Sequence, residues 1–169
     1  ISQLNFENVH INTDQIVATG DEAEQLIKDA INYGTLCVSA EAVGSMESCY
    51  LKTVEYTKSR EQFGQPISNF QVLQHKMVDM FIEAELCKSL LYKSMIDMHE
   101  NNDSKYRSVS ALKSQVGISG KKVGEDAVQL HGGMGVSEEM SIGHYLKRFI
   151  SIDSQFGNAH FHLKKFNNS

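Results

Sequence analysis

The segment from Arg60 to Gln71 combines side chains that can bind a cofactor with residues that end a helix. Arginine offers a rigid fork of donors for phosphate, glutamine can reach the edge of a ring or a ribose, and an aromatic side chain can cover an apolar ring. Gly64 suits the left-handed position just past a helix C-terminus, and Pro66, the only proline, follows where a stop is expected. The segment is therefore either a plain connector between helices or one that also contacts a planar, phosphorylated ligand.

A second candidate is the glycine-rich run from Gln129 to Gly135. It resembles a dinucleotide fingerprint only superficially, because it ends a helical pattern and follows no strand. One interpretation is a helix C-cap with an extra glycine. The other is that Gly132 and Gly133 leave backbone N–H groups open to a bulky ligand, with Gln129, one turn earlier, as a side-chain contact.

Composition limits the classes of function. The chain has 169 residues, enough for one domain with a substantial core, and a net charge of −5 with no basic stripe, which argues against nucleic-acid binding. No apolar run reaches the length of a membrane span. Cys37, Cys49 and Cys87 form no Cys-x-x-Cys motif and are predicted to be buried, reduced thiols. We expect a reducing compartment, such as a bacterial cytoplasm or a mitochondrial matrix.

Residues 1–17 alternate as a strand would, with Leu4, Phe6, Val9 and Ile11 apolar. A single strand is not stable alone. We therefore expect this strand to be the edge of a missing sheet and the chain, which lacks an initiating methionine, to be a fragment.

The remainder predicts an all-α, antiparallel bundle of the four-helix type. A first helix is expected over residues 21–59, either continuous or broken near Gly34, and a second begins after an N-cap at Ser68 or Asn69. A turn at residues 101–104 precedes a third helix, which ends at Leu130. Two shorter helices are expected at residues 139–151 and 154–166.

The second helix carries an apolar stripe at three–four spacing. Its methionines could form a partner groove, but core packing is the favoured interpretation. The stripe consists of Leu73, Met77, Met80, Phe81, Ala84, Cys87, Leu91, Met95 and Met98.

Residues 56–67, the pair Phe70–Gln71 and residues 129–135 together resemble the C-terminal helical domain of acyl-CoA dehydrogenases, and residues 4–11 resemble the last strand of that family's middle domain. The resemblance implies a remnant of the middle β domain at residues 1–20 and a helical bundle domain at 21–169. It also implies a dimer or tetramer with FAD bound across the subunit interface, an acyl-CoA substrate, and electron-transfer flavoprotein as acceptor. The N-terminal helical domain and most of the β domain would be missing, so this fragment alone should hold little FAD and show no activity.

The resemblance also assigns cofactor contacts by position. Arg60, Gln62 and Phe63 match residues that reach FAD from the neighbouring subunit, and Gln71 begins the next helix in the family's Phe–Gln pair. The adenosine and pyrophosphate would lie on the loop formed by Gln129, Gly132 and Gly133. We expect the connector and the glycine loop to meet only across a dimer interface.

The catalytic base is where the sequence departs from the family. The usual glutamate of a Tyr-Glu-Gly-Thr stretch falls at Gly157, and the alternative position on the first long helix falls at Gly34. Glu41 is the candidate substitute, since it shares a face of small residues with Gly34 and its apolar surroundings predict a raised pKa. A structural role for Glu41 stays open, and Asp153 is a weaker candidate.

Three functions remain possible from the sequence. The chain could belong to an active dehydrogenase, to a catalytically silent FAD-binding subunit that assembles with a partner retaining the base, or to an unrelated bundle without a cofactor. A metal site is not expected, because His160 and His162 are two residues apart and would lie on opposite faces of a helix.

Overall fold

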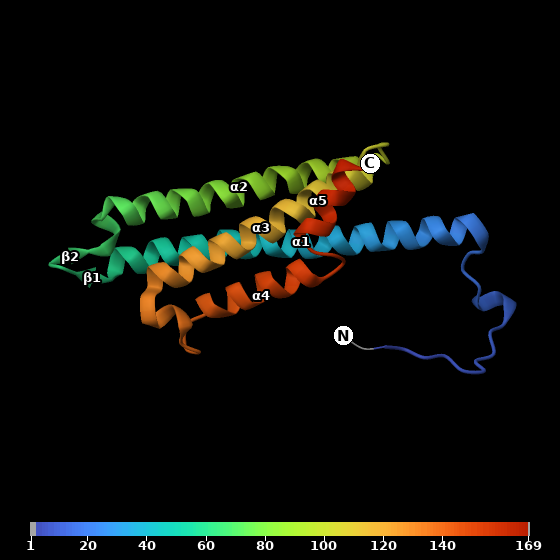
Figure 1. Ribbon diagram of the computed structural model, residues 1–169, viewed down its shortest axis with the longest axis horizontal. Helices are drawn as coiled ribbons and strands as arrows, with labels where there is room; N and C mark the ends of the chain where they lie inside the picture. Colours follow the sequence, from blue (N-terminus) through green and yellow to red (C-terminus); the bar gives the residue numbers. More distant parts are fainter. Residues whose placement is uncertain (1–2, 169) are drawn as a thin grey trace.

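The computed structural model describes residues 3–168 and confirms an all-α fold, an elongated antiparallel bundle (Figure 1). Three long helices run up, down and up, and two shorter helices lie against the third. The helices are α1 Gly20–Ser59, α2 Gln71–His99, α3 Lys105–His131, α4 Ile142–Ser154 and α5 Ala159–Asn167. The remaining elements are the 3-10 turns η1 Thr13–Gln15, η2 Ile67–Asn69 and η3 Gly132–Val136, and the strands β1 Glu61–Gln62 and β2 Gln65–Pro66.

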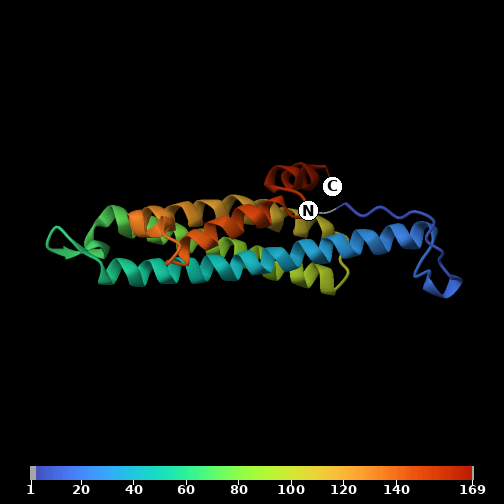
Figure 2. The ribbon, with the colours of Figure 1, turned by 90° about the horizontal axis from the view of Figure 1, so that it is seen from below.

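Helix α1 is continuous over 40 residues, so the expected break near Gly34 is wrong. Asp21 and Glu22 in its first turn complement the helix dipole. Gly34 instead marks a close approach, because a Cβ there would lie 2.7 Å from Cζ of Phe156. The first turns of α1 project beyond the other helices (Figure 2) and leave Ile27 and Ile31 exposed.

The N-terminal segment is extended but forms no strand between residues 3 and 19, which corrects the strand expected there. Residues 1 and 2 of that expected strand lie outside the described residues. Leu4 and Phe6 are exposed, and between residues 3 and 19 the only regular structure is the short turn η1. A strand needs neighbours to take up its backbone hydrogen bonds, and no neighbouring strand is present in the described part of the chain.

The connector between α1 and α2 is a small β-hairpin in which β1 pairs antiparallel with β2. Phe63 and Gly64 both have positive φ, 55° and 81°, as a two-residue hairpin turn requires. Gly64 is therefore a turn residue and not the residue after a helix C-terminus, since α1 ends at the C-cap Arg60. The N-cap of α2 is Phe70, which corrects the expected cap at Ser68 or Asn69.

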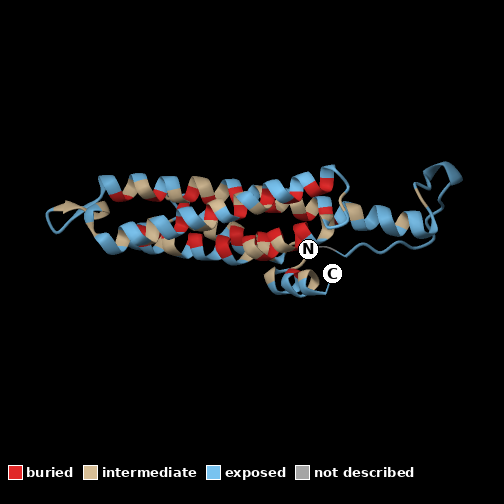
Figure 3. Cartoon of the chain, turned by 90° about the horizontal axis from the view of Figure 1, so that it is seen from above, coloured by how far each residue is buried: buried red, intermediate tan, exposed pale blue. Residues whose placement is uncertain are grey.

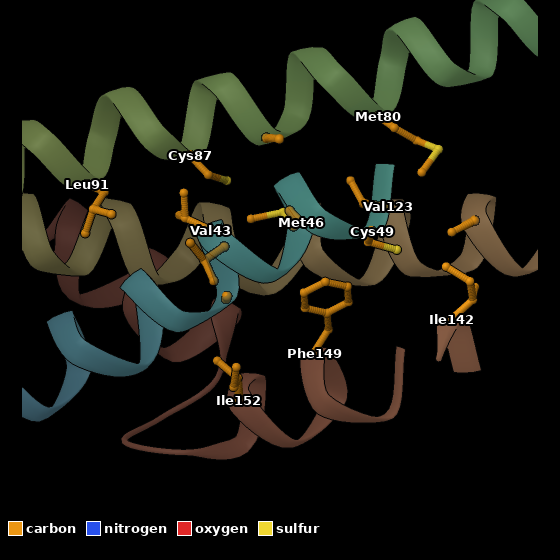
Figure 4. Close-up of a cluster of buried hydrophobic side chains, with 14 of the residues drawn as sticks. Val43, Met46, Cys49, Met80, Cys87, Leu91, Val123, Ile142, Phe149 and Ile152 are labelled. Carbon is orange, nitrogen blue, oxygen red and sulfur yellow. The ribbon is translucent and has the colours of Figure 1, made fainter. Parts of the chain in front are cut away.

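Helix α3 is the centre of the bundle, and all four other helices pack against it. Buried side chains line the inner faces of the long helices (Figure 3). Phe149 and Ile152 of α4 belong to one core cluster with apolar side chains from α1, α2 and α3, and they close the side of this cluster opposite α2 (Figure 4). This arrangement buries one face of α4 and fixes where the loop after it can lie.

The methionine-rich stripe of α2 is a core stripe in its central part, as predicted. Leu73 and Met77 pack against the core, but Phe81 and Met95 are 45% and 48% exposed. Phe81 and Met95 lie at the border of the face by which α2 packs against α1 and α3. The buried members are Met80, Ala84, Cys87, Leu91 and Met98.

The cysteines divide into two environments. Burial raises the pKa of Cys49 to about 12 and that of Cys87 to about 11, so both are unreactive thiols. Cys37 is exposed, contrary to the expectation that all three are buried. Within residues 3–168, no helix is both long enough and apolar enough to cross a bilayer.

Candidate functional site

The connector and the glycine loop lie together at one end of a single chain. Because α1 and α3 run in the same direction, their C-terminal ends meet there, beside the start of α2 (Figure 1). They enclose a hollow of about 430 Å³. The expectation that these segments meet only across a dimer interface is therefore wrong. The lining residues are Tyr56, Arg60, Gln62, Ile67, Gln129, Leu130, His131, Gly132, Gly133 and Met134.

The polar lining of this hollow, which we call the glycine-loop hollow, is open to a ligand. Gly132 is the C-cap of α3 with φ 58°, and a Cβ built on either Gly132 or Gly133 would meet nothing within 4 Å. Arg60 and Gln129 are exposed, and no carboxylate in residues 3–168 lies within ion-pair distance of Arg60. A guanidinium beside open backbone is suited to phosphate oxygens.

A stacked pair that the sequence analysis did not single out forms the floor of the glycine-loop hollow. The rings of Tyr56 and His131 lie 4.1 Å apart with an interplanar angle of 22°. His131 Nδ1 lies 2.8 Å from the Ala127 carbonyl, to which it donates, and burial lowers the pKa of the ring, which keeps it neutral. Their positions in the sequence could have indicated this pair, because Tyr56 lies one helical turn before Arg60 and His131 lies inside the glycine-rich run.

Two of the predicted cofactor residues lie outside the hollow. Phe63, at the hairpin tip, is 90% exposed, and its ring lies edge-on to that of Phe70, with the ring centroids 6.1 Å apart. Gln71, the first residue of α2, is also exposed and does not line the hollow. The structure thus brings together five of the seven, Arg60, Gln62, Gln129, Gly132 and Gly133.

The two positions expected for a catalytic acid, Gly34 and Gly157, lie near each other, because the ring of Phe156 covers Gly34. Gly157 and Phe156, but not Gly34, line a second hollow of about 520 Å³, and none of its lining residues is an aspartate or glutamate. Gly157 has φ 100°, and a Cβ there would lie 2.5 Å from Cδ1 of Phe161. A glutamate at this position would strain the present backbone. The lining residues are Ile31, Asn32, Thr35, Phe156, Gly157, Phe161, His162 and Lys165.

The buried Lys113 holds the end of α4, next to the α4–α5 loop that carries Gly157. Lys113 is fully buried, and its Nζ donates to the carbonyls of Ile152 at 2.9 Å and Asp153 at 3.0 Å. These carbonyls belong to the last turn of α4, where a cation complements the helix dipole. Asp153 accepts a hydrogen bond from the backbone of Ala159 at 2.8 Å, which makes it a structural residue at the start of α5.

Glu41 does not have the raised pKa that its sequence context predicted. Its carboxylate accepts two hydrogen bonds from Arg148, at 2.6 Å from Nε and 2.7 Å from Nη2. This bidentate pair lowers the pKa of Glu41. The error arose because Arg148 is 107 residues away in sequence and its approach depends on how α4 packs against α1.

The two C-terminal histidines differ in burial. His160 is exposed, whereas His162 is buried and its Nε2 donates to the Phe156 carbonyl at 3.0 Å. Burial lowers the pKa of His162. Across residues 3–168, no group of three or more His, Cys, Asp or Glu side chains is placed to hold a metal ion.

The fold and the site define the class: a helical-bundle domain whose connector and glycine loop form one ligand-sized hollow. A family model described as the acyl-CoA dehydrogenase C-terminal domain matches residues 25–159, and the chain belongs to the acyl-CoA dehydrogenase family.

Known relatives agree with this assignment. Over 145 residues, 86% of this chain, it is 27% identical to the short-chain-specific acyl-CoA dehydrogenase of Megasphaera elsdenii. Over 130 residues, 76% of the chain, it is 31% identical to acyl-CoA dehydrogenase IpdE2 of Mycobacterium tuberculosis. The chain covers 38% and 39% of these two relatives.

Solved structures share the fold. A structure described as PigA with FAD and proline superposes with a TM-score of 0.89 at 23% identity, covering 96% of this chain and 42% of that one. The chain therefore spans about two fifths of the length of these relatives and of this structure.

Proposed function

We propose that the chain is the C-terminal, FAD-binding and oligomerisation domain of a flavin-dependent acyl-CoA dehydrogenase, an enzyme that introduces a double bond between the α and β carbons of an acyl-CoA thioester. The observation that carries the proposal is the glycine-loop hollow, where a free guanidinium, amide side chains and open glycine backbone converge. Residues of these types suit a dinucleotide. The FAD complex among the related folds supports the same choice of ligand.

The residues that line the glycine-loop hollow match different parts of FAD. Arg60 would neutralise pyrophosphate oxygens, Gln62 and Gln129 would hydrogen-bond to the adenosine side, and Gly132 and Gly133 would let the cofactor approach the backbone. FAD supplies the acceptor for the hydride that leaves the β carbon. Electron-transfer flavoprotein is the proposed oxidant of the reduced enzyme.

The hollow is at the small end of the range for ligand sites, so FAD would extend beyond it. Phe63 projects from the hairpin tip and is nearly fully exposed, as a residue that covers a neighbouring subunit's cofactor would be. We propose that a homo- or hetero-oligomer, a dimer or a tetramer, completes the site.

Titration of the full-length apoprotein with FAD, followed by flavin fluorescence, tests the assignment. Arg60→Gln removes a charge-assisted contact and should weaken FAD binding by about ten- to a hundredfold. The matched control is Lys58→Gln, since this exposed ammonium is two residues away but pairs with Glu55 at 2.8 Å. Equal affinities for the wild type and Arg60→Gln would refute the site.

A second candidate function is a catalytically silent subunit of a mixed acyl-CoA dehydrogenase complex. Three observations favour it: Gly34 lies under Phe156, Gly157 has a backbone unsuited to glutamate, and Glu41 is paired with Arg148. The base would then come from another chain.

Turnover of an acyl-CoA by the purified, FAD-loaded protein, with an artificial electron acceptor, separates the two functions. A silent subunit should bind FAD without turnover and gain activity when assembled with a related chain that retains the glutamate. Turnover by the homo-oligomer alone would eliminate this second candidate.

A further inference from the structure

Residues from the end of α2, the start of α3 and α5 line a third hollow. These helix ends lie at the opposite end of the bundle from the β1–β2 hairpin (Figure 1). Its volume is about 420 Å³, within the range of small-molecule sites. Arg107 lines it, and Gln129 lines the glycine-loop hollow; at about 1.5 Å per residue along α3, roughly 33 Å separates them. The third hollow is therefore independent of the proposed flavin site.

One wall of this hollow is cationic. The guanidinium of Arg107 lies over the ring of Phe166, 4.5 Å from its centroid, and no carboxylate in residues 3–168 is within ion-pair distance of it. Lys93 also lines the hollow, but it pairs with Asp97 at 2.8 Å, so these two charges offset each other. Arg107 thus leaves a net positive charge at the hollow.

The start of α3 adds to this potential. The N-cap of α3 is Ser104, which lines the hollow and whose side chain makes no capping hydrogen bond. The positive end of a helix of this length favours an anion. Arg107 and the helix terminus therefore act in the same direction.

An unsatisfied hydroxyl lies in the wall of the same hollow. Ser94 is only 1% exposed, and its Oγ has no hydrogen-bond partner among the described residues. Burying a hydroxyl without a partner is unfavourable, and most buried polar side chains have one. A ligand oxygen in the hollow would provide the missing partner.

The rest of the lining is apolar, with Leu90 from α2, Ala111 from α3 and Phe166 from α5. We propose that this hollow binds a small amphipathic monoanion, a short aliphatic carboxylate. The carboxylate lies between Arg107 and the Ser94 hydroxyl, and the aliphatic chain packs on Leu90, Ala111 and Phe166. This assignment does not depend on FAD binding.

Hexanoate, 1-hexanol and inorganic phosphate are the probes, each titrated into the purified protein and followed by NMR. Hexanoate should saturate one site, shift the Ala111 methyl resonance and bind about tenfold or more tightly than hexanol. Phosphate should bind more weakly than hexanoate, because it has no apolar part. Equal binding of hexanoate and hexanol, or of hexanoate and phosphate, would overturn the ligand class.

Two variants test the polar contacts. Arg107→Gln should weaken hexanoate binding about tenfold and leave hexanol binding unchanged. The control Lys121→Gln removes an equal charge from an exposed position on α3 and should bind hexanoate as the wild type does. Wild-type affinity in Arg107→Gln, or shifts at Gly132 and Gly133 in place of Ala111, would overturn the site.

Ser94→Ala distinguishes a ligand contact from a packing defect. Without hexanoate this variant should be as stable as the wild type or more stable, because it removes an unsatisfied buried hydroxyl. Its hexanoate affinity should nevertheless fall. Unchanged affinity would exclude the hydroxyl from the site and contradict the proposed binding geometry.

Discussion

Glu41 shows how one ion pair changes the interpretation of a residue. Sequence context suggested a carboxylate that holds its proton, whereas the bidentate contact with Arg148 holds it ionised. We propose that Glu41 joins α1 to α4 and does not abstract the substrate proton. A base freed for proton transfer would need to lie against the substrate carbon, and Glu41 lies against a guanidinium.

Glu41→Gln in the full-length assembly should therefore keep turnover within about threefold of the wild type, whereas loss of a general base costs about two to four orders of magnitude. Steady-state rates with a saturating acyl-CoA provide the measurement. Arg148→Gln is the matched control, because it breaks the same pair from the other side. A hundredfold loss in Glu41→Gln alone would restore Glu41 as the base.

Gly133 tests whether the open backbone of the glycine loop is a ligand surface. A side chain there meets nothing within 4 Å, and Gly133 is not among the glycines with positive φ. Gly133→Val should therefore keep the stability within about 0.5 kcal/mol, as expected of a surface substitution. FAD affinity in the full-length protein should nevertheless fall, because the new side chain would occupy the space of the cofactor.

Thermal unfolding and FAD titration of Gly133→Val give the two readouts. Gly132→Val is the contrasting variant, since φ 58° at Gly132 makes any side chain strained. Undiminished FAD affinity in Gly133→Val would show that the loop does not face the cofactor.

At the scale of elements, Lys113 connects α3 to the end of α4. Lys113→Met keeps the length of the side chain but removes the ammonium donor from the carbonyls of Ile152 and Asp153, and the Ile152 carbonyl then keeps only the Gln155 N–H at 3.1 Å. The loss of two buried, charge-assisted hydrogen bonds should lower the free energy of unfolding by about 2 kcal/mol or more. Urea unfolding measures the change.

The control for this element is Lys121→Met, an exposed lysine on the same helix, which should change stability by less than about 0.5 kcal/mol. Hydrogen exchange should also rise selectively at the start of α5, since the α4–α5 loop loses its support. Unchanged stability in Lys113→Met would mean that the burial cost of the ammonium offsets its hydrogen bonds.

At the scale of the whole molecule, two buried neutral histidines, His131 and His162, should make the free energy of unfolding fall at acidic pH. The folded pKa values of His131 and His162 are below their ordinary value of 6.5, so below that pH the unfolded chain binds more protons than the folded one. Their stabilising contribution is complete above pH 6.5 and is lost as the pH falls towards the folded pKa values. Each histidine should contribute a slope of up to about 1.4 kcal/mol per pH unit.

Urea unfolding between pH 7.5 and 5.5 should show this loss of stability. His162→Gln should reduce the slope, because one of the two titrating groups is gone, and His160→Gln, an exposed position, should not. A wild-type slope in His162→Gln would contradict the assignment of that group.

Helix number, helix order and the antiparallel bundle followed from the sequence, because apolar periodicity and turn residues are local signals. The resemblance at residues 56–71 and 129–135 also indicated the family. The sequence alone could not decide the environment of Glu41, the hairpin at Phe63–Gly64 or the support of the α4 terminus by Lys113. Each depends on contacts between residues distant in the chain, or on backbone angles that packing selects. The strand expected at residues 1–17 had the right local pattern, but strand formation requires a neighbouring strand, and tertiary structure alone decides whether one is there.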